Sequence, residues 1–376
     1  MKILFCDNTL WGLVNFRGAV IAHLRDKGHQ VVLVAPEKED KQLQTKVPEG
    51  IKYIPISMGR TSMNPWNDLK LFVRLYRIYR KERPDYIFHY TIKPNIYGSI
   101  AAKACGIPST AMMAGMGFAF AKKSLLTRLI KHLYTIGLRC TDKLLVLNEE
   151  NRQDIIKTRL CTPEKIIKLD GGEGVDCSAF PMYNNESTQT TFLFVGRILW
   201  EKGYKEFVEA ARIVKQKHPD AQFCIVGALD PAQPHSVPKE ELDADIRQGT
   251  VQYKGFINDM RTIYAQSGLV ITLPSFYREG MNRALMEACA SGKPIITTNI
   301  AGCRELVTEG KNGFIIPIKE SEQLAKAMIK YLNLSSDEKA AFSRHSREMA
   351  ESKFNILQVL PIYEQILFDA QKEKVL

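Results

Sequence analysis

Short apolar segments alternate with longer stretches of helical periodicity along nearly the whole chain. Apolar runs of this length are typical of strands buried on both faces, and apolar positions three or four residues apart indicate helices. The repeated order of strand, turn and helix predicts α/β domains with parallel sheets. In the first half we expect strands at 2–6, 30–35, 52–56, 86–90, 109–113 and 143–147, and helices at about 16–27, 68–82, 95–105 and 122–140.

A polar stretch at 183–190 interrupts this pattern, and we interpret it as an interdomain linker. The repeat then resumes, with strands expected at 191–196, 222–227, 251–256, 269–274 and 294–298 and helices at 204–217, 260–267 and 281–291. At 376 residues the chain exceeds what one hydrophobic core usually organises. We therefore expect two Rossmann-like domains, 1–183 and 190–355, with an amphipathic helix at 356–376 that packs back on the first domain.

The net charge of +11 is either carried by ordinary solvated Lys and Arg or indicates an anionic partner. Nucleic acid is not favoured, because the chain has no helix-turn-helix pattern and no zinc-finger spacing. A phosphorylated substrate or an anionic membrane surface agrees better with the composition.

The cysteines and the N-terminal residues indicate in which cellular compartment the protein is located. Eight Cys are scattered without a C-x-x-C pair, which predicts reduced thiols and neither a disulfide framework nor a zinc site. The first residues are typical of a strand and not of a signal peptide, and no apolar run approaches the roughly 20 residues that span a bilayer. We expect a cytoplasmic protein.

Two carboxylates, Glu279 and Glu287, stand eight residues apart where a strand ends and a helix begins. The backbone N–H groups of Gly280, Met281 and Asn282 at this helix start suit a polar or anionic ligand. The carboxylates can bind sugar hydroxyls through charge-assisted hydrogen bonds. For an isolated pair, the favoured alternative is a capped helix whose second Glu faces solvent.

Arg197 and Lys202 follow the first strand of the expected second domain and emerge at the same sheet edge as Glu279. A guanidinium and an ammonium there can bind a diphosphate, the first as a fork and the second as a point charge. Alone, the two cations are more typical of a solvated loop. Their combination with the paired carboxylates favours a binding site.

At this point the chain resembles the family 4 glycosyltransferases, which are retaining, depend on nucleotide sugars and have the GT-B fold. The matching motifs are Gly12, Gly174-Val175-Asp176 with Phe180, Val195-Gly196-Arg197 with Lys202-Gly203, Gly255 with Asp259-Met260, Leu273-Pro274-Ser275, the Glu279 to Glu287 stretch, and Gly302 with Glu305 and Asn312-Gly313. The resemblance implies two Rossmann-like domains facing each other across a cleft, with the acceptor bound by the first and the donor by the second.

The resemblance also implies roles for single residues. Arg197 and Lys202 are similar to the pair that binds the donor diphosphate and stabilises its departure, and Glu279 to the acid that holds the donor sugar. The donor-binding residues that it implies are Gly12, Ile257, Gly280, Met281, Asn282 and Glu287. Among these, Glu287 is similar to the ribose ligand, Ile257 lies where the family's backbone contacts the base, and Gly12 belongs to the loop that closes on the phosphates.

Two departures from the family pattern leave questions open. Many members have a His after the strand at 109–113, and this chain has none. The backbone amides from Gly115 to Gly117 are one replacement, and His89 is another, although a structural role is the favoured interpretation of this histidine. Asn282 stands where Pro is common, which leaves the donor sugar undefined.

A narrower resemblance is to bacterial enzymes that extend an undecaprenyl-diphosphate-linked sugar, such as the α-1,3-N-acetylgalactosaminyltransferases of protein N-glycosylation. It is carried by 60–65, 15–17, 89–95 and 277–280. It implies a UDP-sugar donor, a lipid-diphosphate-linked glycan as acceptor and a role in surface polysaccharide or glycoprotein assembly. The candidates for binding acceptor or phosphate are Asn15, Arg17, Lys93, Gly115 and Gly117.

The alternatives are a glycosyltransferase with a soluble or different lipid acceptor, a nucleotide-sugar epimerase, and a catalytically silent nucleotide-sugar-binding membrane protein. The epimerase is disfavoured because it needs acid and base residues around the sugar carbon. The helix at 122–140 carries only basic charges besides its apolar residues, which indicates a peripheral location on the inner face of the plasma membrane. The alternative is a core-facing helix with a solvated basic face.

One tripeptide spells a metal-binding signature of another glycosyltransferase fold. Asp243-Ala-Asp245 has the D-x-D form, but it lies in a segment that is typical of a solvated acidic helix. We therefore expect no catalytic metal and no cofactor. No protein nucleophile is expected either.

Overall fold

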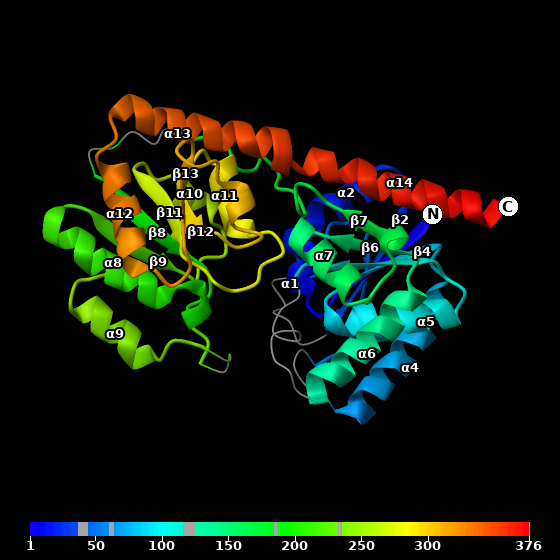
Figure 1. Cartoon of the computed structure of the whole chain (residues 1–376). Helices are drawn as coiled ribbons and strands as arrows, with labels where there is room; N and C mark the ends of the chain where they lie inside the picture. Colours follow the sequence, from blue (N-terminus) through cyan, green and yellow to red (C-terminus); the bar gives the residue numbers. More distant parts are fainter. Residues whose placement is uncertain are drawn as a thin grey trace. The chain divides into compact units, whose positions relative to one another are not determined.

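The computed structural model describes residues 1–36, 44–59, 64–115, 125–183, 187, 189–231, 233 and 235–375. The chain divides into two compact units (Figure 1). The first consists of Met1–Glu173 and Ile356–Leu376, and the second of Gly174–Asn355. The described helices include none that is both long enough and apolar enough to cross a bilayer.

A seven-stranded parallel sheet organises the first unit, in the order β3-β2-β1-β4-β5-β6-β7. Its strands are β1 Lys2–Cys6, β2 Gln30–Pro36, β3 Lys52–Ile56, β4 Tyr86–Tyr90, β5 Ser109–Met113, β6 Lys143–Val146 and β7 Ile166–Lys168. Its helices are α1 Leu10–Phe16, α2 Gly18–Asp26, α4 Pro65–Glu82, η1 Pro94–Gly98, α5 Ser99–Ala104, α6 Leu125–Cys140, α7 Glu149–Lys157, η3 Pro163–Lys165 and α14 Ile356–Val375. The strand order reverses between β1 and β4, the point where open α/β sheets bind ligands.

A six-stranded parallel sheet organises the second unit, in the order β10-β9-β8-β11-β12-β13. Its strands are β8 Thr191–Val195, β9 Gln222–Val226, β10 Gln252–Tyr253, β11 Leu269–Leu273, β12 Ile295–Thr298 and β13 Gly313–Ile316. Its helices are η4 Trp200–Lys202, α8 Tyr204–Lys217, α9 Lys239–Arg247, α10 Arg261–Tyr264, α11 Arg283–Ala290, η5 Arg304–Leu306, α12 Ser321–Leu332, α13 Ser336–Met349 and η6 Ala350–Phe354.

Burial explains why these segments form strands. All five residues of β4, YIFHY, are buried, and so are those of β5 and β11. The rings of Phe5 and Phe88 stack with centroids 5.2 Å apart, and Phe5 also stacks on Tyr90. Covered on both faces by helices, such strands need continuous apolar runs, which is the pattern that predicted them.

Two expected elements differ from the structure. The helix expected at 16–27 is α2, Gly18–Asp26. A separate helix that the sequence did not predict, α1, precedes it at Leu10–Phe16, and the Thr9 side chain caps its start by accepting from the Gly12 amide. The strand expected at 251–256 is reduced to Gln252–Tyr253. Gly255, with φ of 76°, turns the chain out of the extended conformation.

The boundary between the units lies ten residues earlier than the sequence predicted, and residues 174–183 belong to the second unit. The Val175 amide donates to the Phe354 carbonyl at 2.7 Å. Arg347 on α13 donates to the carbonyls of Cys177 at 3.1 Å and Phe180 at 2.6 Å. These bonds attach the segment to the second unit, although the polar stretch that suggested a linker begins only after it.

Helix α14 belongs to the first unit. Its Glu364 pairs with His23 of α2 at 2.6 Å, and its Tyr363 hydroxyl is 3.1 Å from that of Tyr90 on β4. Tyr363 is almost fully buried, as are the neighbouring apolar residues of the same face. The chain therefore leaves the first unit after Glu173 and returns to it at residue 356.

Candidate functional site

The carboxyl ends of β8 and β11, which are neighbours in the second sheet, hold the predicted charged residues. Arg197 and Lys202 follow β8, and Glu279 follows β11. Lys202 Nζ forms an ion pair with Glu279 Oε1, and both side chains are largely buried. The structure thus brings together two of the three residues to which we assigned catalytic roles.

Close packing of two loops sets this geometry. Gly203, with φ of 85°, lies so near the end of β11 that a Cβ there would be 2.2 Å from the Pro274 carbonyl oxygen. The Phe276 amide donates to the Glu201 carbonyl at 2.8 Å. The loop after β8 is therefore fixed against the loop after β11, which places Lys202 beside Glu279.

The aromatic ring of Tyr277 lies beside both cations. Lys202 Nζ is 5.0 Å from the ring centroid and Arg197 Cζ is 5.7 Å from it, within the range of cation–π attraction. Arg197 is exposed, whereas Lys202 is buried. Sequence reasoning did not single out Tyr277 as a site residue. Its position two residues before Glu279, in the same loop, was the available signal.

Asn282 and Gly302 hold the turn that carries Glu279. The Asn282 side chain accepts from the Leu285 amide at 3.1 Å and so caps α11, while its Nδ2 lies 3.4 Å from Glu279 Oε1. The Asn282 amide donates to the Gly302 carbonyl at 2.8 Å. The expectation of three free amides in this turn is therefore wrong for Asn282. Gly280 is buried and Met281 half-buried beside it.

Glu287 lies one turn into α11, because the helix begins at Arg283. Its carboxylate is 15% exposed and accepts from Arg283 Nε at 2.8 Å. Burial raises the pKa of Glu287, and the adjacent guanidinium partly offsets this effect. The alternative in which Glu287 faces solvent is contradicted. Ile257, the expected base contact, is half-buried against the core of the same unit.

In the first unit, Gly12 occupies a crowded position in α1. Its amide donates to Thr9 Oγ1 at 3.3 Å, and an added Cβ would be 3.0 Å from Asp7 Oδ2. The Asn15 side chain donates to the Trp11 carbonyl at 2.9 Å. Gly115 is half-buried after β5, and Gly117 lies outside the described residues.

The two cations proposed to bind acceptor or phosphate already have carboxylate partners. Arg17 is buried, 2.6 Å from Glu173 and 3.8 Å from Asp7, with its guanidinium 4.5 Å from the Tyr90 ring centroid. Lys93 pairs with Asp68 at 2.7 Å and is also largely buried. A phosphate would therefore compete with these carboxylates.

His89 has the surroundings of a structural histidine. It is fully buried in β4, and its Nε2 is 3.0 Å from the Tyr79 hydroxyl. Burial lowers the pKa of His89 to about 3, so the ring is neutral. An added Cβ at Gly98 would be 2.6 Å from the imidazole, which leaves no room beside it on that side.

The D-x-D tripeptide lies in α9, and both aspartates have protein partners. Asp243 pairs with Lys239 at 2.8 Å. Asp245 is buried and accepts from the Tyr204 hydroxyl at 2.6 Å and from Arg212 at 2.5 Å. Within the described parts of the chain, no three His, Cys, Asp or Glu side chains are grouped as metal ligands. The cysteines, all eight of which are described, are free thiols, and burial raises the pKa of Cys6 to about 12.

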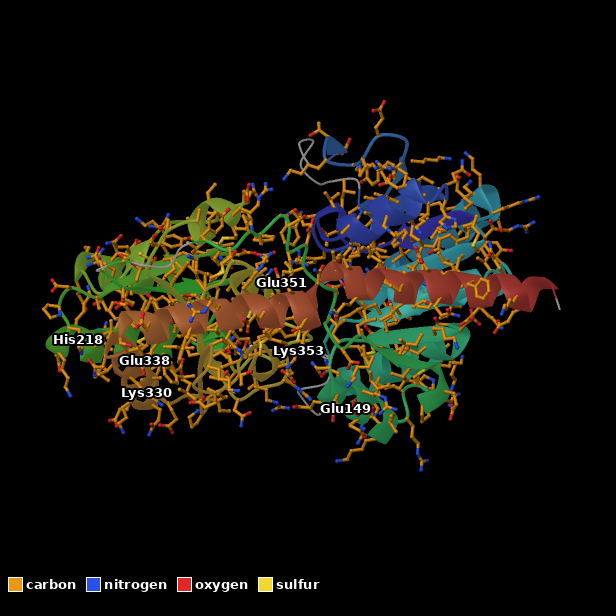
Figure 2. The ribbon with its side chains drawn as sticks, turned by 90° about the horizontal axis from the view of Figure 1, so that it is seen from above. Glu149, His218, Lys330, Glu338, Glu351 and Lys353 are labelled. Atoms are coloured by element: carbon orange, nitrogen blue, oxygen red, sulfur yellow. The ribbon has the colours of Figure 1, made fainter. Side chains whose placement is uncertain are left out.

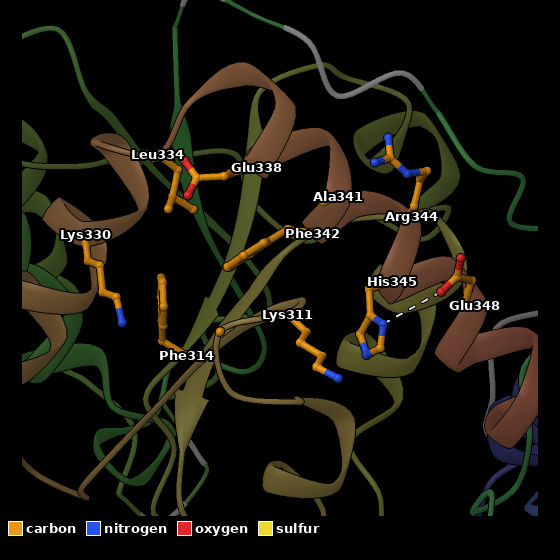
Figure 3. Close-up of a pocket in the computed structure, with 11 residues that line it drawn as sticks. Lys311, Phe314, Lys330, Leu334, Glu338, Ala341, Phe342, Arg344, His345 and Glu348 are labelled. Carbon is orange, nitrogen blue, oxygen red and sulfur yellow. Dashed lines mark ion pairs between the residues drawn. The ribbon is translucent and has the colours of Figure 1, made fainter.

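A pocket of about 570 Å³ lies elsewhere on the second unit, beside β13, α12 and α13 (Figure 3). Lys311, Lys330, Arg344 and His345 contribute positive or titratable groups to its rim, and His345 pairs with Glu348 at 3.7 Å. None of the predicted donor residues lines this pocket.

Each half of the chain matches a known family model. Residues 2–148 match the model described as glycosyl transferase 4-like, and residues 179–349 match the model of glycosyl transferases group 1. The two matches correspond to the two units of the structure.

Several curated relatives align with most of the chain. N,N'-diacetylbacillosaminyl-diphospho-undecaprenol alpha-1,3-N-acetylgalactosaminyltransferase of Campylobacter jejuni is 29% identical over 344 residues, covering 87% of this chain and 88% of that protein. UDP-Gal:alpha-D-GlcNAc-diphosphoundecaprenol alpha-1,3-galactosyltransferase of Escherichia coli is 28% identical over 318 residues, covering 80% of each. Among solved structures, a glycosyltransferase from Rickettsia africae aligns with a TM-score of 0.78 at 21% identity, covering 99% of this chain and 98% of that one. At this identity the likeness concerns the fold alone.

Proposed function

Because the chain belongs to the glycosyltransferases that these two family models describe, with the GT-B fold that its sequence predicted, we propose that it extends a lipid-linked glycan. The donor is a UDP-sugar that carries a hexose or N-acetylhexosamine, and the acceptor is a sugar on undecaprenyl diphosphate. Two relatives that align over most of the chain are named for diphospho-undecaprenol acceptors, and the E. coli enzyme among them is named for UDP-Gal. The product belongs to a bacterial surface polysaccharide or glycoprotein.

The observation that carries the proposal is the ion pair of Lys202 and Glu279 beside the exposed Arg197. A buried ammonium and carboxylate stabilise each other, since removal of either leaves an uncompensated charge. A diphosphate placed here gives Lys202 a second anionic partner. The carboxylate of Glu279 then has lone pairs for the donor sugar's hydroxyls.

The reaction follows from these roles. The bond between the anomeric carbon and the donor phosphate breaks, and Arg197 and Lys202 stabilise the charge that develops on the leaving UDP. The acceptor hydroxyl forms the new glycosidic bond on the same face of the sugar, and its proton passes to the leaving phosphate. This sequence retains the anomeric configuration without a protein nucleophile. It requires no metal, because the two side-chain cations supply the positive charge.

A panel of UDP-sugars tests the proposal with a synthetic undecaprenyl-diphosphate-linked N-acetylhexosamine as acceptor. We expect UDP release and an extended glycan with one donor, in the presence of EDTA. The product's anomeric configuration is then measured by NMR. A catalytically silent binding protein would release no UDP, and activity that EDTA abolishes and Mn²⁺ or Mg²⁺ restores would contradict the metal-independent mechanism.

We also propose a peripheral location on the inner face of the plasma membrane, mediated by α6. Tyr134 and Leu138 of α6 are buried, so this helix does pack on the core of its unit. Its exposed residues combine basic and apolar side chains: Arg128, Leu129, His132, Ile136 and Arg139. A face of this composition binds an anionic leaflet through both attraction and burial. Lys122 and Lys123, which the sequence placed in the same helix, lie outside the described residues.

A further inference from the structure

The chain enters the second unit through residues 174–183. Two arginines attach this segment to helix α11. Arg283, the first residue of α11, donates from Nη1 to the Gly174 carbonyl at 2.5 Å. Arg347 donates to the Cys177 carbonyl at 3.1 Å and to the carbonyl of Ala290, the last residue of α11, at 2.5 Å. The first residue of α11 is thus bonded to the entering segment. Its last residue is bonded to Arg347, which also binds that segment.

Arg283 makes a second bond, which leads to the proposed nucleotide site. Its Nε donates to Glu287 Oε1 at 2.8 Å while its Nη1 binds Gly174. A guanidinium is rigid and planar, so its donors cannot move independently of one another. The position of the Glu287 carboxylate is therefore linked to that of the Gly174 carbonyl.

Gly174 lies at a special place in the chain. It is the first residue of the second unit and follows Glu173, the last residue of the first segment of the other unit. The next residue, Val175, pairs with Asn355, after which the chain crosses back. Both chain crossings thus meet at one point of the second unit. Figure 2 shows Glu351 and Lys353 at the end of α13 and η6 that precedes the return crossing.

We propose that Arg283 is a positioning residue that joins Glu287 to the chain crossing at Gly174, so that filling the nucleotide site orders the crossing. The inference rests on the proposed function and on the role that the family resemblance implies for Glu287, which is to accept the ribose hydroxyls. A carboxylate has about four lone-pair sites and accepts from a hydroxyl and from Arg283 at once. A ribose that fixes Glu287 also fixes the guanidinium and its bond to Gly174. By linkage, that bond must strengthen nucleotide binding by the same factor.

The charge of Arg283 also opposes the rise in the pKa of Glu287. Burial raises the pKa of Glu287, Asp259 raises it further, and the guanidinium acts in the opposite direction. The phenol of Tyr264 interacts with both residues and stays neutral because burial raises its pKa. Burial acts to raise the pKa of Asp176, but hydrogen bonds from Ser178 and Ala179 and the charge of Arg283 lower it. Without Arg283 the carboxylate takes up a proton at a higher pH, and it then accepts fewer hydroxyl hydrogen bonds.

Calorimetric titration with UDP tests the link between Arg283 and Glu287. We expect Arg283→Met to weaken UDP binding about tenfold at pH 7.5, and by a larger factor at pH 6. The protonation of UDP itself cancels in the ratio to wild type. Arg283→Lys keeps the positive charge and one hydrogen bond, so its affinity for UDP should lie between that of wild type and that of Arg283→Met. In turnover, the donor KM should rise while kcat changes less than about twofold, because the proposed mechanism assigns the leaving phosphate to Arg197 and Lys202 and not to Arg283.

A double-mutant cycle gives the decisive comparison. If Arg283 acts through Glu287, then Arg283→Met should have little further effect on UDP affinity in a Glu287→Gln background. The matched control is Arg344→Met on α13, an exposed arginine of the same unit, which should bind UDP as wild type does (Figure 3). An equal loss in both backgrounds would show that Arg283 does not act through Glu287 and would overturn the inference.

Hydrogen exchange tests the link to the crossing. The Val175 amide, bonded to the Phe354 carbonyl, should exchange more slowly when UDP saturates the wild-type protein. In Arg283→Met at saturating UDP this slowing should disappear. Slowing that persists in the variant would overturn the inference and leave the proposed function intact, whereas a wild-type protein that binds no UDP would overturn the UDP donor of the proposed function.

Discussion

Lys202 and Glu279 are the pair on which the proposed chemistry depends. Replacing Lys202 with Ala removes one cation from the leaving diphosphate and leaves a buried carboxylate without its nearest opposite charge. We expect turnover to fall by about 10²-fold or more, and Arg197→Ala to have a similar effect. Steady-state UDP release measures both. Lys205→Ala, an exposed lysine three residues further on, is the control; near-normal turnover in both site variants would contradict the assignment.

Asp7 makes stability depend on pH. Burial raises the pKa of this carboxyl from 3.8 to about 6, although Arg17 acts to lower it. Since the folded pKa is the higher one, the protonated form stabilises the protein below pH 3.8, and this contribution, about 3 kcal/mol, is lost as the pH rises through 6. Asp7→Asn should therefore gain a few degrees in Tm over wild type at pH 8 and less at pH 5. The exposed Asp26→Asn serves as control, and parallel Tm profiles would argue against this account.

The sequence predicted the positions of some site residues but not the partners of others. Charges that directly follow strands, such as Lys202 and Glu279, could be placed at one sheet edge because parallel strands end together. The partner of Arg17 could not be found in this way, since Glu173 lies 156 positions away and meets it only in the folded unit. The bond from Arg283 to Gly174 was hidden for the same reason.

Among the elements, strands were predicted well and short helices poorly. The strands β4 and β5 and the last four residues of β1 are buried, and most of their residues are apolar, which is the pattern expected of a strand covered on both faces. Helix α1 was missed because seven residues are too few to show periodicity, and its start depends on one side-chain cap. Helix α7 and strand β7 were missed too, and β7 has only three residues.

Gly302 keeps two loops of the second unit in contact. Its φ is 83°, and an added Cβ would be 2.7 Å from both Glu279 Cβ and the Gly280 carbonyl oxygen. Gly302→Ala should displace Glu279 and lower kcat/KM by at least about tenfold, since a misplaced group costs more than the strain itself. Gly310→Ala is a matched control, because its φ is 71° and nothing lies within 4 Å. An equal effect of both substitutions would attribute the loss to backbone strain.

Helix α6 offers the test of membrane binding. Changing Arg128, Lys131 and Arg139 to Gln should weaken sedimentation with anionic liposomes by about 10²-fold at low salt, at roughly 1 kcal/mol per charge. The difference should shrink at high salt because such attraction is screened. The control changes the same number of exposed cations on the second unit: Lys205, Lys217 and Arg247. If both triple variants bind liposomes equally, net charge and not α6 determines the binding.

For the whole molecule, the repeat of strand, turn and helix was sufficient to predict two Rossmann-like units. The boundary was not predictable from composition. Polar residues suggested a linker at 183–190, but the contacts of Val175 and Arg347 decide that the second unit begins at Gly174. A polar composition shows which residues do not pack in a hydrophobic core. It does not show at which residue the chain leaves one unit and enters the next.

Removal of α14 should affect the two units differently. Ending the chain after Asn355 exposes the apolar surface of the first unit on which Tyr363 and its neighbours pack. The second unit keeps all its strands. We therefore expect limited proteolysis to cut the first unit rapidly and to leave a resistant fragment of about residues 174–355. Tyr363→Phe is the mild control, which loses the 3.1 Å contact with Tyr90 alone. Equal resistance of both units would contradict a stabilising role for this helix.

The position of α14 in the chain also sets an order of assembly during translation. A ribosome releases the chain from its N-terminus, and domains fold as units while they emerge. The second unit is therefore complete in sequence before the first unit receives its last helix. Until then the apolar surface of the first unit that α14 covers stays exposed to water. This half of the nascent chain is therefore the one that depends on chaperones.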